Sequence, residues 1–592
     1  MTAMFAVVAV DHHVIKETLE IARRNRDLRV LWQAPGCVVG VYGDTLSADS
    51  YGMRQFSFSQ ANVVINSSST PNNRVLGKQI DTDPAALSHG VPGAHTAFCW
   101  LAAKQQLIAS RDPLNQHSLY YARLANATVV SSEARFIADL MPAKPALNPA
   151  ALACWLAGEP NPALSLYAKI HALPLGCSLM AGVEGSLQET TFWDIDPHHE
   201  IRLPNDADYS DSFAELLNTA VSSHIAGEDQ VVVSQMSGGM DSTSITALAH
   251  TMLSPARLCR PLSHLYSQSA SCDETTNIQA MYDHLALNNP IQVTVDSGEH
   301  RDFLSLYPTD FDSPGTVLSP RYHQECELIS AAGSRRLLTG NGGDEMCWGH
   351  ASAYTERIRN GELGVISEVL KACDQTHMAR WPVLRSLFVK PLIPEWLLRL
   401  GRQLKGRNNA DQPAWLTPQG AALAREAGTV SNPFHPQRQP VGYARYQALK
   451  TTSTFNSLRS YQKVAWQYNI AVAHPFFDKR IAEFSFAVPP KQLIRGAYPK
   501  WLLRSAMDKI LPDRVCWDMQ KVTFDNHFGQ LVKDNARPLR ELLTDTRLQE
   551  MGLLDNARLL DAFDKTVNGS VAHVHVDLLY AILTQRWIQQ HH

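Results

Sequence analysis

Two glycines and several small hydroxyl side chains stand between a β-branched run, VVVSQM, and a helical segment. The loop reads Ser237-Gly238-Gly239-Met240-Asp241-Ser242-Thr243. In such a loop the backbone N–H groups and the positive end of the helix dipole point at one spot, and hydroxyls add further donors. The spacing is not that of the Walker loop. The sequence therefore predicts an anion site, and Asp241 within it requires a cation such as Mg²⁺ between its carboxylate and the anion.

This loop resembles the SGG-x-DS loop of the ATP pyrophosphatases, which grip the β- and γ-phosphates and release them together. The chain is similar to the asparagine synthetase-like amidoligases of that group. A second segment, LLTGNGGDEMCWGH (337–350), resembles their strand–G-x-G-x-D-E segment. The resemblance implies ATP and Mg²⁺ as cofactors, with Asp241 and Asp344 as catalytic and metal-binding residues. It also implies that the backbone near Met236 and Gly340 lies against the nucleoside, and that the loop residues Ser237, Gly238, Gly239, Ser242 and Thr243 bind the pyrophosphate.

A third block, residues 471–524, is similar to the family series PFLD…LP…K-x-LLR…LP…K-x-x-F. Lys521 falls where the family places a lysine that contacts the reacting carboxyl and phosphate oxygens, so we expect it to be catalytic and to bind ATP. A point cation is what a developing oxyanion requires. Lys500 and Arg504 match the K-x-LLR helix, where we expect Arg504 to brace the fold.

The N-terminal region retains the resemblance but lacks a nucleophile. Glutamine-dependent relatives begin Met-Cys-Gly-Ile, with the cysteine as N-terminal nucleophile, whereas the corresponding run here is Met4-Phe5-Ala6-Val7-Val8. A phenyl ring has no thiol or hydroxyl with which to attack an amide, and residues 1–3 keep any free amine away from that position. The glutamine-binding turn N-G-E reads Asn66-Ser67-Ser68. We therefore expect a degenerate glutaminase-like domain that makes no ammonia, and nothing around Cys37 supports it as a substitute.

An ATP pyrophosphatase site without a glutaminase can pass an acyl-adenylate to an amine already on its substrate. Two branches of the family do so: β-lactam synthetases and the macrolactam synthetases that close lasso peptides. Position 341 is Asn, which cannot accept a proton as the Tyr–Glu dyad of β-lactam synthetases does. Added helical sequence between 350 and 460 suits a peptide substrate. These features favour a lasso peptide cyclase. It would join an Asp or Glu side chain of a precursor peptide to the peptide's N-terminal amine.

Several readings stay open. The runner-up enzymes are a β-lactam synthetase and an ammonia-dependent asparagine synthetase-like amidoligase, and the non-enzyme alternative is a degenerate peptide-binding scaffold. The general base is unassigned among Glu345, Tyr322 and the departing phosphate. The expected partners are the precursor peptide, a leader peptidase and a leader-recognition protein.

The elements that must position these residues fall into two regions. Residues 1–200 carry short alternating runs separated by turn residues, which predict an antiparallel β sandwich of the Ntn glutaminase type. From 208 to 592, strands alternate with helices, which predicts an α/β ATP pyrophosphatase domain with a parallel sheet, followed by added helices. The basic amphipathic patch at 380–407 is expected to be a surface helical hairpin, with a partner-docking surface as the alternative.

Composition narrows the class of protein. The 592 residues are 45% hydrophobic with a formal net charge of −4, so there is no basic excess for a nucleic-acid partner. No apolar run reaches the roughly 20 residues of a membrane span, and the N-terminus lacks a signal-peptide pattern. None of the ten cysteines forms a C-x-x-C pair, so neither a zinc knuckle nor a redox motif is indicated. We expect a soluble cytoplasmic protein with free thiols.

Overall fold

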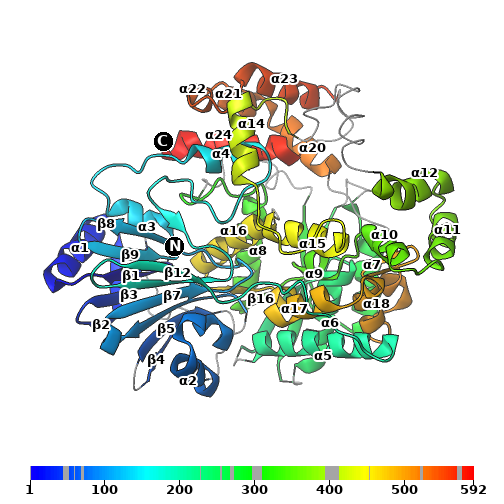
Figure 1. Ribbon diagram of the computed structural model, residues 1–592, viewed down its shortest axis with the longest axis horizontal. Helices are drawn as coiled ribbons and strands as arrows, with labels where there is room; N and C mark the ends of the chain where they lie inside the picture. The colour runs from blue at the N-terminus through cyan, green and yellow to red at the C-terminus, as the bar shows by residue number, and fades with distance from the viewer. Residues whose placement is uncertain are drawn as a thin grey trace.

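The structure is a computed structural model. It describes residues 2–43, 53–58, 61–67, 73–91, 93–226, 229–253, 256–266, 272–295, 310–393, 412–451, 454–519, 525–569 and 576–592. Three large sheets organise it (Figure 1).

The N-terminal region contains two six-stranded antiparallel sheets. The first has the spatial order β10 (His171–Ala172), β8 (Tyr120–Leu124), β9 (Ala127–Ser131), β1 (Thr2–Val8), β3 (Cys37–Gly43) and β2 (Asp27–Ala34). The second has the order β12 (Leu187–Thr191), β11 (Cys177–Gly182), β7 (Gln106–Arg111), β6 (His95–Leu101), β5 (Ala61–Ser67) and β4 (Met53–Ser57). Their β-branched and aromatic residues suit a pleated, buried surface.

The two sheets pack face to face and helices cover their outer faces. Alternate residues of β1, among them Met4 and Ala6, meet Trp100 and Leu107 of the second sheet in one core. The outer face of the first sheet packs on α1 (His12–Asn25) and α3 (Ala134–Asp139). The outer face of the second packs on α2 (Asn73–Thr82) and the short helix η1 (Pro84–Gly90). The region is therefore a layered sandwich, helix–sheet–sheet–helix.

The second region is built on a five-stranded parallel sheet. Its spatial order is β15 (Ile291–Thr294), β14 (Leu258–Leu265), β13 (Val231–Gln235), β16 (Arg336–Leu338) and β17 (Ala471–Ala473). One face packs on α5 (Asp206–Ile225), α6 (Met240–Met252) and α7 (Thr275–Leu285). The other face packs on α8 (Ser319–Ala331) and α16 (Thr454–Gln467). Parallel strands buried on both faces place their carboxyl ends along one edge, where open α/β sheets bind ligands.

The remaining helices extend the sheet region. Beside the sheet lie α9 (Gly343–Cys347), α10 (Ser352–Arg359), α11 (Val365–Gln375), α12 (Arg380–Leu384), a π-helical turn η5 (Arg385–Val389), η6 (Lys390–Leu392), α15 (Pro440–Thr451), η7 (Pro475–Phe477), α17 (Lys479–Ala487), η8 (Pro490–Gln492), the two-stranded β18 (Ile494–Arg495) and β19 (Tyr498–Pro499), α18 (Trp501–Met507) and α19 (Asp513–Cys516). Within the described ranges, none of the helices has the length and apolar character that crossing a membrane requires.

A helical layer formed late in the chain packs on the N-terminal region. It comprises α14 (Pro418–Ala427), α20 (Asp525–Asp534), α21 (Ala536–Leu542), α22 (Arg547–Glu550), α23 (Asn556–Val567) and α24 (Val576–His591), seen beside α4 (Pro149–Leu156) in Figure 1. The side chain of Trp415 donates to Leu156 O at 3.0 Å. Trp155 of α4 and Tyr580 of α24 meet edge to face, with ring centroids 5.5 Å apart. One apolar core thus contains side chains from both ends of the chain.

Most expected elements are present. The short alternating runs expected within residues 1–200 include β1, β3, β5, β6, β7, β8 and β9, and the antiparallel sandwich and parallel sheet are confirmed. No strand was expected at β2, β4, β10, β11, β12, β17 or the β18–β19 hairpin. The expectation that the chain is mostly helical after 350 hides β17, because a three-residue strand shows no periodicity. Of the patch at 380–407, the described part forms α12, η5 and η6, while 394–411 lie outside the described residues.

A buried cation connects the two regions. Lys463 of α16 pairs with Asp310, and with Asp312 at 2.7 Å, and its side chain is 7% exposed. Asp312 also accepts from the backbone N of Arg135 on α3 at 3.2 Å. Removing one partner of a buried ion pair leaves an uncompensated charge.

We therefore expect Lys463→Met to lower the apparent free energy of unfolding by about 3–5 kcal/mol. Urea unfolding followed by tryptophan fluorescence measures the change. Lys371→Met, at an exposed position on α11, is the matched control and should leave the midpoint unchanged. Equal midpoints for the two variants would show that the pair contributes nothing.

Candidate active site

The glycine loop follows the carboxyl end of β13 and opens α6, as the sequence predicts. Gly238 has φ +81°, and a side chain there would approach Cβ of Asn277 to 2.9 Å, so only glycine fits. Gly239 caps α6, whose first backbone N–H groups have no partner within the helix. Ser242 Oγ accepts from Ser237 N and lies 3.0 Å from Ser237 Oγ. The loop thus gathers amide and hydroxyl groups at a helix N-terminus, which is suited to an anion.

The second predicted segment packs directly against this loop. Gly340 follows β16, the strand next to β13, and a Cβ there would lie 2.3 Å from Ser242 N. A Cβ at Gly343 would lie 2.2 Å from Cγ of Asp241. The glycines after β16 therefore let the backbone touch the start of α6. As a result Asp344, in the first turn of α9, comes beside Asp241.

One ammonium group joins the two predicted acids. Lys500 Nζ lies 2.8 and 2.6 Å from the two carboxylate oxygens of Asp241 and 2.7 Å from Oδ1 of Asp344. The side chains of Lys500 and Asp241 are 11% and 21% exposed, whereas that of Asp344 is 59% exposed. Burial lowers the pKa of Lys500, but the two carboxylates outweigh it and raise the pKa above its usual range. Lys500 is therefore held as a cation.

The backbone of Lys500 is in an unusual conformation. Its φ of +57° lies in the left-handed region, which non-glycine residues rarely adopt, and it caps α18 just after the β18–β19 hairpin. Its ammonium also lies 5.6 Å from the ring centroid of Trp348. Strained backbone conformations persist at sites whose surroundings fix them. Sequence reasoning placed Lys500 on a matching motif without giving it a role.

The donor set fits the predicted metal. Two carboxylates from neighbouring strand ends converge on one point, and oxygen ligands of this kind suit Mg²⁺. Asp241 and Asp344 would hold the ion, which would supply charge neutralisation for the phosphates. Lys500 also lies against both carboxylates, and its ammonium balances part of their negative charge.

A carboxyl group that sequence reasoning missed lies on the glycine loop. Glu274, at the start of α7, is partly buried, and its Oε1 would lie 3.4 Å from a Cβ at Gly239. Burial, with the nearby charge of Asp518, raises the pKa of Glu274 to about 8, although a hydrogen bond with Ser237 opposes the shift. Glu274 is thus neutral at pH 7. A glutamate at position 274 gives no sign of a special role in the sequence, because its raised pKa comes from burial.

Of the other residues named from the sequence, some are hydrogen-bonded within the fold and one lies outside the described residues. Met236 N donates to Leu262 O at 2.8 Å, and Met236 O accepts from Ser263 Oγ at 2.7 Å, so its backbone is tied to β14. The Thr243 hydroxyl donates to Gly239 O and stays within the loop. Lys521 lies outside the described residues. Arg504 donates to the carbonyls of Pro499, Cys516 and Asp518, so it braces the fold as expected.

The position expected for a glutaminase nucleophile is filled by packed aromatic rings. Phe5 lies in the middle of β1, paired with Gly40 and Ser131 in the flanking strands, and is fully buried. Its ring stacks on Phe136 with centroids 4.3 Å apart, and a Cβ at Gly40 would clash with it at 2.6 Å. Cys37 is also fully buried, and burial raises the pKa of its thiol. A buried thiol with a raised pKa supplies no thiolate.

Tyr322 and Glu345, the two side chains left open as the general base, differ in solvent exposure. Tyr322 is 6% exposed and stacks on Tyr461 with centroids 4.0 Å apart. Burial, reinforced by Glu325, raises the pKa of Tyr322. Asn341 N donates to the Thr339 hydroxyl at 3.2 Å. Glu345 follows Asp344 in α9.

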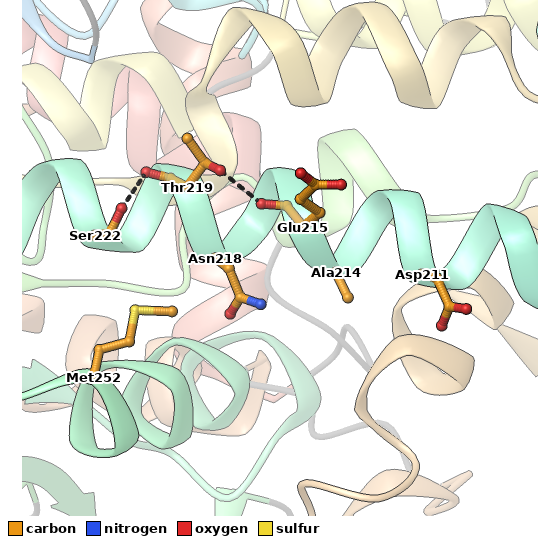
Figure 2. A pocket seen from close by; sticks show the side chains of 7 residues that line it. All are labelled: Asp211, Ala214, Glu215, Asn218, Thr219, Ser222 and Met252. Carbon is orange, nitrogen blue, oxygen red and sulfur yellow. Dashed lines mark hydrogen bonds between the residues drawn. The ribbon is translucent and has the colours of Figure 1, made fainter.

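A surface hollow of about 420 Å³ lies away from these groups, along α5 (Figure 2). It is lined by Asp211, Ala214, Glu215, Asn218, Thr219, Ser222 and Met252. The hydroxyls of Thr219 and Ser222 donate to carbonyls of their own helix, at Glu215 and Thr219. These groups are therefore satisfied within α5 and do not converge on a ligand.

The raised pKa of Glu274 predicts how phosphate binding depends on pH. A carboxyl with a raised pKa is neutral below that value and negative above it. Since the loop is the predicted phosphate site, we expect the affinity for MgATP to fall about tenfold between about pH 7 and pH 9, and Glu274→Gln to remove most of this fall. Isothermal titration calorimetry measures it. Asp283→Asn, on the same helix, is the control and should keep the wild-type dependence; the same pH dependence in Glu274→Gln would contradict the assignment.

Comparison with known proteins gives both remote relatives and a family. The chain is 20% identical over 529 residues to a protein named Amidase chry2 from Gibberella zeae, covering 81% of this chain and 76% of that protein. Among solved structures, a glutamine phosphoribosylpyrophosphate amidotransferase from B. subtilis, complexed with ADP and GMP, superposes with a TM-score of 0.21 and 9% identity over 50% of this chain and 91% of that one. A structure described as the allosteric regulatory enzyme of purine biosynthesis gives a TM-score of 0.21 with 11% identity over 52% and 82%.

The family comparison covers the site. A family model described as asparagine synthase matches residues 212–589, more than half of the chain, including both glycine segments and Lys500. Members of this family use ATP to form amide bonds, which agrees with an anion loop beside two acids. The chain belongs to the asparagine synthase family and is an ATP-dependent amide-forming ligase.

Proposed function

We propose that the protein is a lasso peptide macrolactam synthetase. It transfers AMP from ATP to the side-chain carboxylate of an Asp or Glu in a precursor peptide, releasing pyrophosphate. The peptide's own N-terminal amine then attacks the acyl-adenylate, forming an isopeptide bond and releasing AMP.

The observation that carries this proposal is the packing around Phe5. A family member that generates ammonia needs a nucleophile at this position, and here the position holds a phenyl ring stacked on Phe136 inside a closed core. The amine must then come from elsewhere. An amine on the substrate itself is the economical source, because an intramolecular reaction needs no ammonia and gains from proximity.

The adenylation step is supported by the converging groups at the strand ends. The amides and hydroxyls of the glycine loop are suited to binding the β- and γ-phosphates, and Asp241 and Asp344 to binding the metal. Bound Mg²⁺ would offset the negative charge of the phosphates next to these acids. Lys500 supplies a positive charge beside the same acids, and the resemblance implies another from Lys521.

A peptide substrate is supported by the segment after the second glycine loop. Leu363, Met378 and Trp381, on and around α11 and α12, are 72%, 58% and 68% exposed. Three large apolar side chains this exposed within one short segment favour an interaction surface there. We propose that the precursor peptide contacts this segment, and that a leader peptidase and a leader-recognition protein act with the enzyme.

Product analysis tests the proposal. The protein is incubated with ATP, Mg²⁺ and synthetic peptides that each carry a free N-terminal amine and one internal Asp or Glu. Loss of one water from a peptide, with equimolar AMP, supports cyclisation. Asparagine formed from aspartate and ammonium would indicate the ammonia-dependent alternative, and ring closure on a small β-amino acid would indicate a β-lactam synthetase. Formation of ADP, or binding of peptide without turnover of ATP, would overturn the proposal.

We expect Asp241→Asn and Asp344→Asn each to slow pyrophosphate release by about 100-fold or more, because each removes a charge that the phosphates and their metal require. A coupled pyrophosphate assay measures the rate. Asp211→Asn, exposed on α5, makes the same chemical change and should behave as wild type. Wild-type rates in both site variants would remove these acids from the mechanism.

Phe5 should matter for packing and not for chemistry. Phe5→Ala would cost about 3–5 kcal/mol of stability, so Phe5→Leu, which keeps most of the volume, is the informative variant. We expect Phe5→Leu to release pyrophosphate at the wild-type rate with the same peptide and to gain no glutamine hydrolysis. A selective loss of cyclisation in a folded Phe5→Leu protein would contradict this.

A further inference from the structure

A buried carboxylate lies under the carboxyl edge of the parallel sheet, on the face opposite the glycine loop helix. Glu325 of α8 has a side chain that is 1% exposed. It accepts hydrogen bonds from His264 Nε2 at 2.8 Å, from Gln235 Nε2 at 2.9 Å and from the hydroxyl of Tyr461. Donors from two strands and from α16 thus converge on one carboxylate.

These donors hold Glu325 in its charged form. Burial acts to raise the pKa of Glu325, but His264, Tyr461 and Arg321 outweigh it, and the net pKa lies below the usual value. A buried charge that is fully hydrogen-bonded produces a fixed local electric field. The charge of Glu325 acts mainly on the imidazole of His264 beside it.

The arrangement defines the tautomer of His264. Because Nε2 faces the carboxylate, Nε2 carries the proton and Nδ1 is left as the basic nitrogen. His264 keeps 17% exposure, and Nδ1 has no hydrogen-bond partner among the described residues. A histidine oriented by a buried carboxylate, with its other nitrogen open, is the usual arrangement of a general base.

The position of His264 relative to the glycine loop follows from the strand pairing. Leu262 of β14 pairs with Gln235 of β13, and Met236, the next residue, donates to Leu262 O. Ser263 points toward α7, where it accepts from the Tyr282 hydroxyl at 2.9 Å, so His264 points to the opposite face. His264 therefore lies at the ligand-binding edge of the sheet, one strand from the predicted nucleotide site.

We propose that His264 is the general base that deprotonates the attacking amine and that Glu325 is its positioning residue. This inference rests on the proposed function. An N-terminal ammonium has a pKa of about 7.7–8.0, so most of it is protonated at neutral pH and cannot attack. Tyr322, an alternative acceptor, is stacked on Tyr461 and has a raised pKa.

The step balances as follows. His264 Nδ1 takes one proton from the ammonium, and the nitrogen lone pair forms the C–N bond at the acyl-adenylate carbonyl. The C–O bond to AMP breaks, its electron pair leaves with the phosphate, and the second amine proton passes to that phosphate. The imidazolium returns its proton to solvent. Among the described residues, the titratable or charged groups that interact with this pair include Arg321, Tyr322 and Cys326 on α8, Tyr461 on α16 and Tyr266 after β14.

The two half-reactions are measured separately in His264→Gln, with a peptide that wild type cyclises. ATP–pyrophosphate exchange reports adenylation and folding, and should stay within about threefold of wild type, while cyclisation falls about 100-fold. Hydroxylamine, which is uncharged at neutral pH, needs no base, so hydroxamate formation should also stay near wild type. His199→Gln, at an exposed position, is the control. Unchanged cyclisation, or an equal fall with both nucleophiles, would overturn the proposal.

Two further readouts separate a positioning role from a structural one. In Glu325→Gln cyclisation should fall while ATP–pyrophosphate exchange and hydroxamate formation stay near wild type; an equal loss in all three, or no loss in cyclisation, would overturn the role of Glu325. Carbethoxylation of the wild-type protein by diethyl pyrocarbonate, mapped by mass spectrometry, should modify His264, and an unreactive His264 would overturn its role. If no peptide yields AMP, the proposed function fails, and this footprint still decides whether His264 presents a basic nitrogen.

Discussion

The site depends on one ammonium shared by two carboxylates. Lys500 meets Asp241 and Asp344 within 2.8 Å, although the three residues come from separate segments of the chain. Each acid alone would be an unfavourable neighbour of a phosphate-binding loop, and the pair together would repel each other. The positive charge of Lys500 offsets both of these repulsions. Lys500 also adopts a backbone conformation that is unfavourable for a lysine, directly after the β18–β19 hairpin.

The two faces of the parallel sheet carry different chemical groups. On the face of α6 and α7, backbone amides, hydroxyls and the neutral carboxyl of Glu274 surround a position for phosphates. On the face of α8 and α16, the charged carboxylate of Glu325 is held by three donors and orients an imidazole. Adenylation and proton removal are thereby separated by the thickness of the sheet and joined at its carboxyl edge.

Local sequence patterns predicted the strands and helices with a regular hydrophobic period. They also predicted the site residues that directly follow strands. Alternation located most of the sandwich strands. Asp241 and Asp344 were expected together because both follow parallel strands that end at one edge. The role of Lys500 was not predictable, since it depends on a two-stranded hairpin and a left-handed residue. The hydrogen-bond cluster at Glu325 joins the ends of two strands to two helices far apart in the chain, and the raised pKa of Glu274 arises from burial. No single sequence pattern records either feature.

The contact between α4 and the late helices has a structural consequence. Trp155 and Leu156 of α4 lie in the same core as Trp415, Tyr580 and Trp587, so the N-terminal region supplies part of the hydrophobic interior of the C-terminal helical layer. Deleting that region would expose this interior to water. A position such as Phe5 can therefore lack a nucleophile while the sandwich around it keeps a structural role, because the helical layer depends on its packing.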